Sequence, residues 1–295
     1  MPTPVELYRR GRKILDNTGY CEGETDTRVL LLHALRITRE QYYISGNEME
    51  VSPEKVELFE NYLRKRIARM PVAYITGRKE FMGIEFAVNP SVLIPRPATE
   101  TLVNAGLGIL EKLPSPLPLA ADIGCGSGCI ALSLAFYNPV VRVAAVDISP
   151  DALKTAVSNA EAVEAAHPGR FILNRVTFMN GDLFGSFPED EAGAFDLILS
   201  NPPYVTEAEW EDLMSGVKLY EPKTALCPPM DAEEFYAKIA REALVFLKKD
   251  GWLLVEIGAY QGEMIKMVFN SAGFEDVFML QDLEGFDRVV GGRKP

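Results

Sequence analysis

Cysteine and histidine are scarce in this chain of 295 residues, which contains 4 Cys and 2 His. The cysteines are Cys21, Cys125, Cys129 and Cys227. No two of them form the Cys-x-x-Cys pair that is typical of zinc sites and thiol redox centres, so the sequence predicts no metal site and no redox site. His33 and His167 stand apart from every motif described below, and we expect both to be structural or surface residues.

Long apolar stretches are also missing. No segment reaches the roughly 18 consecutive apolar residues that identify a transmembrane helix. Residues 1–15 are charged and lack the apolar segment of a signal peptide. Together with the absence of an evident disulfide framework, these features predict a protein of the reducing cytoplasm with no membrane partner.

Positive charge is in deficit, and the deficit is confined to one part of the chain. The formal net charge is −12. Residues 1–80 carry 14 Lys and Arg against 12 Asp and Glu, whereas residues 81–295 carry 16 against 30. A surface this negative repels the phosphates of nucleic acids. Direct DNA binding is therefore not expected.

The N-terminal part has the pattern of a small helical bundle. Apolar residues recur at helical spacing in Pro4–Asp16, Thr25–Leu35 and Ser52–Met70. In the third segment Ser52 is suited to the N-cap, and Pro53 occupies the first helical position, where its missing N–H costs nothing. We therefore predict a helical domain over residues 1–75.

A connector over residues 76–97 follows this helical domain. Lys79–Val88 is predicted to be a hairpin, because glycine lies near its centre between short apolar runs. A second domain over residues 98–295 is predicted to begin with a helix at Thr99–Leu110.

Beyond residue 118, apolar strands alternate with helical segments. The predicted strands are Leu119–Ile123, Arg142–Asp147, Ile172–Met179, Phe195–Ser200, Trp252–Ile257, Asp276–Leu280 and Phe286–Gly291. The predicted helices are Ser127–Phe136, Pro150–Val163, Ala232–Leu247 and Gly262–Ala272. This alternation predicts an α/β fold with a parallel, doubly wound sheet. Only Gln281–Gly285 joins the last two strands, which is too short for a parallel crossover, so they should be antiparallel.

A glycine-rich loop follows the first of these strands and opens a helix. It contains Gly124, Cys125, Gly126, Ser127 and Gly128. Glycines let the backbone turn tightly and approach a ligand closely. Asp147 ends the next strand, where a carboxylate can accept hydrogen bonds from ribose hydroxyls. Asp182 follows the third strand, a position suited to an adenine amino group. Both NAD and S-adenosylmethionine (SAM) fit this geometry, but the spacing Gly-x-Gly-x-Gly favours SAM.

The tetrapeptide Asn-Pro-Pro-Tyr at 201–204 follows the fourth strand, at the edge of the sheet where ligands bind. An amide nitrogen is a poor nucleophile because its lone pair is delocalised. Acceptors that bind its N–H groups in the transition state can localise that lone pair. The Asn201 side-chain oxygen and the Pro202 carbonyl are suitable acceptors, and the fixed φ of proline keeps the second one aimed. Tyr204 offers a flat face to the substrate group.

These motifs together give the chain a resemblance to the PrmC/HemK family of protein-(glutamine-N5) methyltransferases, which act on peptide-chain release factors. The stretches that carry it are Met70–Gly83, Val92–Glu100, the glycine loop, Ser200–Tyr204, Tyr220–Lys223 and Val255–Gly262. They span nearly the whole chain. The resemblance implies a Rossmann-like, seven-stranded SAM methyltransferase sheet whose last strand is antiparallel, preceded by a helical domain that helps to grip the release factor.

The resemblance also implies roles for individual residues. Residues 124–128, Asp147, Leu183 and Asn201 would bind SAM, and residues 201–204 would hold the glutamine of a Gly-Gly-Gln loop during translation termination. The chain departs from the family pattern at Ala98, at Leu183 and at 227–229. Arg96, Thr99 and Glu100 match the family pattern, either as catalytic contacts or as a structural ion pair.

Two other functions remain open from the sequence. An adenine-N6 nucleic-acid methyltransferase would use the same Asn-Pro-Pro-Tyr site on a flipped base. It should carry basic surface for phosphates, which the acidic catalytic part lacks. The second alternative is a cofactor-binding module that has lost catalysis, against which the intact tetrapeptide argues.

Overall fold

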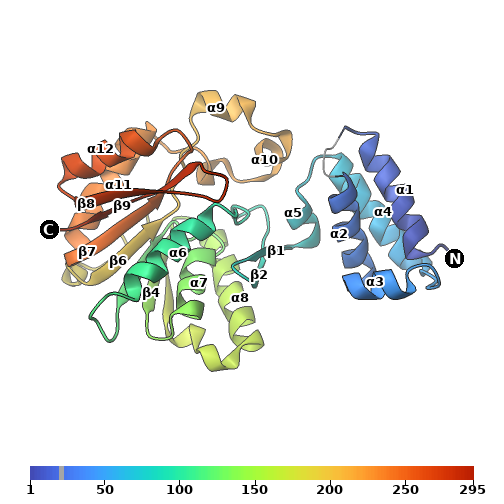
Figure 1. Ribbon diagram of the computed structural model, residues 1–295, viewed down its shortest axis with the longest axis horizontal. Coiled ribbons are helices and arrows are strands. Elements are labelled where there is room, and N and C mark those ends of the chain that lie inside the picture. Colours follow the sequence, from blue (N-terminus) through green and yellow to red (C-terminus); the bar gives the residue numbers. More distant parts are fainter. Residues whose placement is uncertain (20–22) are drawn as a thin grey trace. The chain divides into compact units, whose positions relative to one another are not determined.

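The computed structural model describes residues 1–19 and 23–295, so Cys21 lies outside the described residues. The chain divides into two compact units (Figure 1). The first unit contains Met1–Arg78 and Met214–Tyr220, and the second contains Lys79–Leu213 and Glu221–Pro295. Most of the segment expected as a connector, residues 76–97, thus belongs to the second unit.

The first unit is helical, in agreement with the helical pattern of its sequence. Its helices are α1 (Pro4–Asp16), α2 (Gly23–Leu35), α3 (Arg39–Ser45), α4 (Pro53–Ile67), α5 (Val72–Thr76) and α10 (Ser215–Tyr220). Helix α1 begins with a capping box, in which the Thr3 side chain accepts from the Glu6 N–H and the Glu6 carboxylate accepts from the Thr3 N–H. Ser52 stands at the N-cap of α4 as predicted, but its side chain makes no capping hydrogen bond.

Leucine and phenylalanine side chains from α1, α2 and α4 form the core of the first unit. Gly11 lets α1 approach α4 closely, since a Cβ there would lie 2.8 Å from the Phe59 ring. Asp26 is buried and accepts from Arg66 at 2.6 Å. At the end of α4, the Ala68 carbonyl accepts from the Tyr220 hydroxyl of α10 at 2.7 Å. Helix α10 is therefore part of this unit, although 135 residues of the second unit (79–213) separate it in sequence from Arg78.

The second unit contains the predicted α/β sheet. Its strands are β1 (Arg78–Phe81), which begins at the last residue of the first unit, β2 (Ile84–Ala87), β3 (Leu119–Ile123), β4 (Arg142–Asp147), β5 (Val176–Asn180), β6 (Phe195–Ser200), β7 (Leu247–Glu256), β8 (Glu275–Gln281) and β9 (Asp287–Arg293). In the described residues, β1 and β2 form the predicted hairpin, and the other strands form one sheet in the order β5-β4-β3-β6-β7-β9-β8. Strand β9 is antiparallel to both neighbours, and the remaining pairs are parallel. The predicted fold class, with its antiparallel last strand, is confirmed.

Helices cover both faces of this sheet (Figure 1). They are α6 (Thr99–Leu110), α7 (Cys129–Tyr137) and α8 (Pro150–Ala166) on one face, and α11 (Ala232–Phe246) and α12 (Gly262–Ala272) on the other. Neighbouring residues of β6 show the division: Leu197 and Leu199 pack with the first group, while Ile198 packs with the second. Because both faces are buried, the inner strands are mostly apolar, as the sequence indicated.

Short elements differ from the predictions. Helices α3, α5 and α10 and helix α9 (Glu207–Asp212) were not predicted from the sequence, since each is too brief to show a helical period. The strand predicted over Ile172–Met179 is wrong in its first half, where Ile172–Asn174 forms a 3₁₀ turn. Phe171 is left-handed there, with φ of 52°, and the Glu164 carboxylate caps the turn by accepting from the Ile172 N–H.

The order of the strands determines where a ligand can bind. The chain adds β4 and β5 on one side of β3, then returns to add β6 and β7 on the other. The carboxyl ends of β3 and β6 therefore meet at a topological switch point, where open α/β sheets bind their ligands. Among the described residues, no helix is long and apolar enough to cross a membrane.

Candidate functional site

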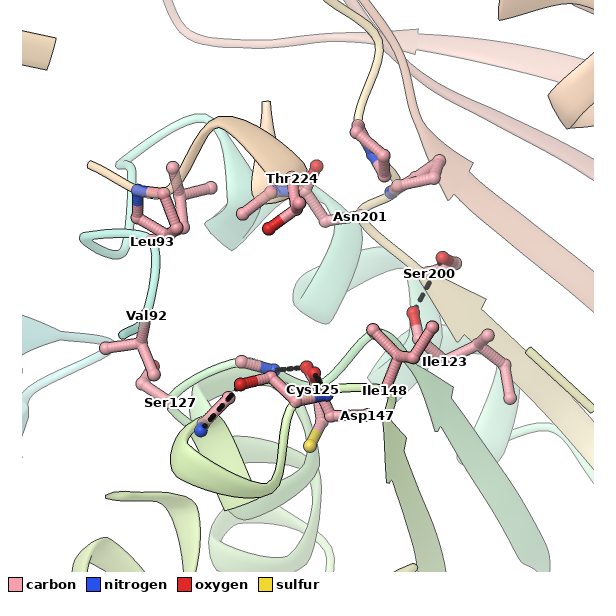
Figure 2. Close-up of a pocket in the computed structure, with 18 of the residues that line it drawn as sticks. Val92, Leu93, Ile123, Cys125, Ser127, Asp147, Ile148, Ser200, Asn201 and Thr224 are labelled. Carbon is pink, nitrogen blue, oxygen red and sulfur yellow. Dashed lines mark hydrogen bonds between the residues drawn. The ribbon is translucent and has the colours of Figure 1, made fainter. Parts of the chain in front are cut away.

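A cavity of about 560 Å³ opens at this switch point in the second unit. Most of the residues predicted for the site line it: Gly124, Cys125, Gly126, Ser127, Asp147, Asp182, Leu183, Asn201, Pro202 and Pro203. Gly128 and Tyr204 do not belong to the lining residues. Figure 2 shows Asn201 and Thr224 on one side of the cavity, with Cys125 and Asp147 on the other.

The glycine loop between β3 and α7 has a backbone that other residues rarely adopt. Gly124, Gly126 and Gly128 have φ of 78°, 54° and 80°. A side chain at the third of these would also crowd α8, because its Cβ would lie 3.2 Å from the Ala156 Cβ. The loop thus needs glycine for its conformation at all three positions, and for close packing at the last.

Asp147 holds this loop through its carboxylate. Oδ2 accepts from the Gly126 N–H and Oδ1 accepts from the Ser149 N–H, each at 2.8 Å. Burial raises the pKa of Asp147, and the two N–H groups oppose this by stabilising its charge. A carboxylate has about four acceptor positions. Asp147 can therefore hold the loop and still accept hydrogen bonds from a ligand's hydroxyl groups.

Apolar side chains lie beside this carboxylate. Ile148 lines the cavity with 65% of its surface exposed, and Leu183 lines it with a left-handed backbone, φ 48°. These two residues offer apolar surface for a flat ring. Ile148 was not predicted as a site residue, although an apolar residue directly after the acidic end of β4 was a usable signal. Asp182 also lines the cavity and lies 3.6 Å from the Lys238 ammonium.

Asn201 follows β6 and is held from two directions. The preceding Ser200 hydroxyl donates to the Ile123 carbonyl at 2.7 Å, which ties the ends of β6 and β3 together. The Asn201 amide group donates from Nδ2 to the Thr99 hydroxyl at 3.2 Å. This orientation leaves the amide oxygen Oδ1 as an acceptor for a substrate N–H group.

Tyr204 is anchored at both of its polar ends by the last residue of β7 and the segment that follows it. Its hydroxyl donates to Glu256 Oε1 at 3.3 Å, and its carbonyl accepts from Gln261 Nε2 at 3.1 Å. The Gln261 side-chain oxygen accepts from the Gly258 N–H at 3.0 Å, which fixes that amide in turn. Burial raises the pKa of Tyr204, so the phenol stays protonated at neutral pH. Tyr204 was predicted from the sequence, but Glu256 and Gln261, which hold it, were not.

Arg96, Thr99 and Glu100, which form the motif at the end of Val92–Glu100, have separate partners. Arg96 lines the cavity and pairs with the buried Glu221, whose second oxygen accepts from the Ile94 N–H at 3.1 Å. Glu100 instead accepts from the Met82 N–H at 3.1 Å. Arg96 and Glu100 thus do not pair with each other, and Thr99 is the member of the motif that contacts Asn201.

Metal ligands do not gather here. In the described ranges, 1–19 and 23–295, no three His, Cys, Asp or Glu side chains are placed to hold a metal ion. Burial raises the pKa of the Cys129 thiol to about 12, so it remains a neutral thiol beside the glycine loop. Burial likewise raises the pKa of Asp122, which accepts from the Ala131 N–H at 3.0 Å beneath the loop, to about 7.

A seven-stranded sheet with one antiparallel strand, together with a glycine loop after β3 and a carboxylate at the end of β4, defines the Rossmann-like methyltransferases that use SAM. The N-terminal domain of human METTL16, solved with SAH, shares this fold with a TM-score of 0.52 at 17% identity, covering 78% of this chain and 82% of that one. Residues 103–219 match the family described as "Methyltransferase small domain".

Sequence relatives define the family more narrowly. Residues 6–77 match the family described as "PrmC N-terminal domain". The release factor glutamine methyltransferase of Geobacter sulfurreducens is 39% identical, with 96% of each chain covered. That of Cereibacter sphaeroides is 38% identical over 94% of this chain and 93% of its own. The chain belongs to the family of release factor glutamine methyltransferases.

Proposed function

We propose that this protein transfers a methyl group from SAM to the side-chain amide nitrogen of the glutamine in the Gly-Gly-Gln loop of peptide-chain release factors. The observation that carries the proposal is the orientation of the Asn201 amide. Its NH₂ group is bound by Thr99, so its oxygen is available to a substrate N–H at the edge of the cavity. The names of the relatives that cover nearly the whole chain support the same substrate.

The cavity fits SAM in size and chemistry. Its volume of about 560 Å³ lies within the roughly 300–1,000 Å³ of small-molecule sites. Asp147 offers acceptors for ribose hydroxyls, and the glycine loop has no side chains at Gly124 and Gly126 that would block approach. Ile148 and Leu183 supply apolar contact for the adenine ring, and Asp182 an acceptor beside it. When bound, SAM supplies an activated methyl group on a positively charged sulfur.

The chain's own residues make the amide nitrogen reactive. The Asn201 oxygen and the Pro202 carbonyl accept its two N–H groups, which favours the geometry in which the nitrogen lone pair is localised. Proline has a fixed φ and no N–H, so the Pro202 carbonyl keeps a fixed aim. Pro203 and Tyr204 complete the turn. No base is needed before attack, since the methylated amide can lose its proton afterwards.

The first unit is the proposed recognition part for the release factor. It is nearly neutral in sequence, while the second unit is strongly acidic, so the two present different surfaces to a partner. The same charge distribution is why we expect no direct DNA binding, and therefore do not favour adenine-N6 methylation. The proposed site of action is the cytoplasm, where translation terminates.

Incubation of the purified protein with labelled SAM tests the proposal. Release factor and an adenine-rich DNA duplex are offered separately, and mass spectrometry locates any added methyl group. We expect a methyl group on the glutamine of the Gly-Gly-Gln loop and none on the duplex. Methylation of adenine, or of neither substrate, would overturn the proposal.

A further inference from the structure

Asn159, on helix α8, joins two parts of the second unit that are far apart in sequence. Its side chain is buried, with 1% of the residue's surface exposed. Nδ2 donates to the Ser127 carbonyl in the glycine loop at 2.9 Å and to the Ala87 carbonyl at the end of β2 at 3.0 Å. Oδ1 accepts from the Ala87 N–H at 2.7 Å. The glycine loop and the β1–β2 hairpin are therefore bound to the same amide group.

These three hydrogen bonds need the particular set of polar atoms that asparagine has. A side-chain amide offers two N–H donors beside a carbonyl acceptor. Both donors of Asn159 are used, each on a different segment, and its oxygen is used as well. A carboxylate of the same shape has no donor, and an apolar side chain would leave two backbone carbonyls and one N–H without these partners. The polar atoms of Asn159 thus serve the hairpin and the loop together.

The Ser127 end of this network is part of the cofactor cavity, because Ser127 lines it. The peptide group between Ser127 and Gly128 is held at both ends. Its carbonyl accepts from Asn159, and its N–H donates to the Cys125 carbonyl at 2.8 Å. The carboxylate of Asp147 holds the N–H of the residue before Ser127. The conformation of the loop therefore depends on α8 as well as on the end of β4.

The Ala87 end of the network leads into another wall of the same cavity. Helix α8 lies beside β2 (Figure 1), and most of the segment 91–96, which follows β2, lines the cavity. Thr155, one helical turn before Asn159, accepts from Asn89 Nδ2 at 2.9 Å. Residues four apart lie on one face of a helix. One face of α8 therefore holds both the glycine loop and the chain that enters the second wall.

We infer that Asn159 is a positioning residue for SAM, which fixes the glycine loop to the β1–β2 hairpin and so sets the separation of the two cavity walls. The inference rests on the proposed function, because it takes this cavity to be the SAM site. Asn159 is not among the residues that line the cavity, so it acts through Ser127 and Ala87 rather than on the cofactor. In return, SAM should make the hairpin harder to open, since a ligand that stabilises the loop also stabilises what is bound to it.

The variant Asn159→Asp tests the effect on SAM binding. Aspartate has the same shape and keeps an acceptor for the Ala87 N–H, but it has no donor for either carbonyl. In calorimetric titration we expect SAM to bind roughly 10- to 100-fold more weakly, because two hydrogen bonds that hold the cavity walls are lost. At saturating SAM, kcat should stay within about threefold, since no contact of the amide site changes.

Two further variants separate this role from general support of the fold. Asn159→Leu removes all three hydrogen bonds without adding a charge, and it should weaken SAM binding roughly 10-fold or more. Val163→Ala, on the same helix, removes buried apolar volume but no hydrogen bond. At a temperature at which all variants are folded, it should leave SAM affinity within about twofold although it lowers the melting temperature. If Val163→Ala weakens SAM binding as much as the Asn159 variants do, Asn159 only stabilises the fold and the inference is overturned.

Hydrogen–deuterium exchange tests the coupling in the unaltered protein. We expect SAM to slow exchange roughly threefold or more in peptides that cover the β1–β2 hairpin, although no residue of this hairpin lines the cavity. In Asn159→Leu the same peptides should exchange equally fast with and without SAM, because the link between loop and hairpin is absent.

The unaltered protein is titrated with SAM first. If it does not bind SAM, the proposed function fails, and this inference with it. If it binds SAM but both Asn159 variants bind SAM equally well, the inference alone is overturned. Exchange of the hairpin that does not respond to SAM in the unaltered protein also overturns it, even if the Asn159 variants prove too unstable to assay.

Discussion

The two halves of the cavity are built from different parts of the polypeptide. On the cofactor side, backbone groups form much of the surface: Gly124 and Gly126, both with positive φ, and the N–H groups that the Asp147 carboxylate binds. On the amide side, side chains do this work, since Asn201 is held by Thr99, and Tyr204 by Glu256 and Gln261. The glycine loop is one short stretch of sequence that one aspartate holds in place. The side-chain-built half depends on residues 99, 201–204 and 256–261, which only the fold brings together.

This difference predicts that the halves fail in different ways. Damage to the amide side should lower the rate and leave SAM binding intact. Damage to the cofactor side should weaken SAM binding and leave the rate at saturation nearly intact.

Asn201→Ala should have the largest effect. It removes an acceptor that is used most strongly in the transition state, so kcat should fall by roughly 10²–10³, or about 2.7–4 kcal/mol. Calorimetric titration with SAM should give an affinity within a few-fold of the original. A turnover close to normal would remove Asn201 from its proposed role.

Asp147→Asn should have the second largest effect, and it should weaken SAM binding rather than lower kcat. The amide offers one acceptor oxygen where the carboxylate offered two, so its NH₂ group must face the N–H donor of either Gly126 or Ser149. We expect SAM to bind roughly 10- to 100-fold more weakly, as is typical when a charge-assisted hydrogen bond of about 1.5–3 kcal/mol is lost. At saturating SAM, kcat should change little. A variant with unchanged affinity and reduced kcat would contradict the division between the halves.

Asp122→Asn should affect stability rather than binding. Asp122 is buried under the glycine loop, and one of its oxygens has no partner among the described residues. Its pKa is raised to about 7 from a usual value near 4. The folded state therefore binds this proton more tightly than the unfolded state does. The protonated Asp122 carboxyl contributes fully to the stability of the fold below about pH 4, and this contribution is lost as pH rises through 7.

The measurement is denaturant unfolding at pH 5.5 and 6.5. Between these two pH values, the free energy of unfolding of the unaltered protein should fall by about 1 kcal/mol more than that of Asp122→Asn. Loss of stability by the same amount in both proteins would show that Asp122 ionises normally in the folded state.

The smallest effect is expected in the first unit. Arg64 and Lys65 are exposed near the end of α4. If this unit recognises the release factor, reversing both charges to Glu should raise the KM for intact release factor several-fold, because peripheral charges mainly alter association. The KM for a short glutamine peptide, which is too small to reach this surface, is the internal control. Equal changes with both substrates would argue against a recognition role.

Much of this architecture follows from local sequence patterns. The bounds of α1, α6 and α12 and of β3, β4 and β6 are those predicted, because periodicity and flanking turns lie within each segment. The antiparallel last strand followed from the brevity of Gln281–Gly285. Short helices such as α3 could not be identified in this way, since a single capping box at Thr38 and Gln41 is a weak signal by itself.

The residues of the site also differ in whether local sequence patterns could predict them. Its cofactor half was visible because glycine spacing and a carboxylate at a strand end are local features. Glu256 lies in a predicted strand and Gln261 directly before a predicted helix, and nothing in the local sequence indicated that they hold Tyr204. Thr99 was identified without a role, because its partner Asn201 is 102 positions away. Contacts at such separations depend on the order of the strands.

Helix α10 makes the two units inseparable by a single cut. It packs in the first unit through the bond between Tyr220 and Ala68, yet the chain before and after it belongs to the second. A protease that cleaves between Arg78 and Lys79 would yield two fragments, and the larger would still carry a piece of the smaller one's fold. The pieces should therefore co-elute after nicking, and a recombinant fragment that ends at residue 78 should be an incomplete version of the first unit.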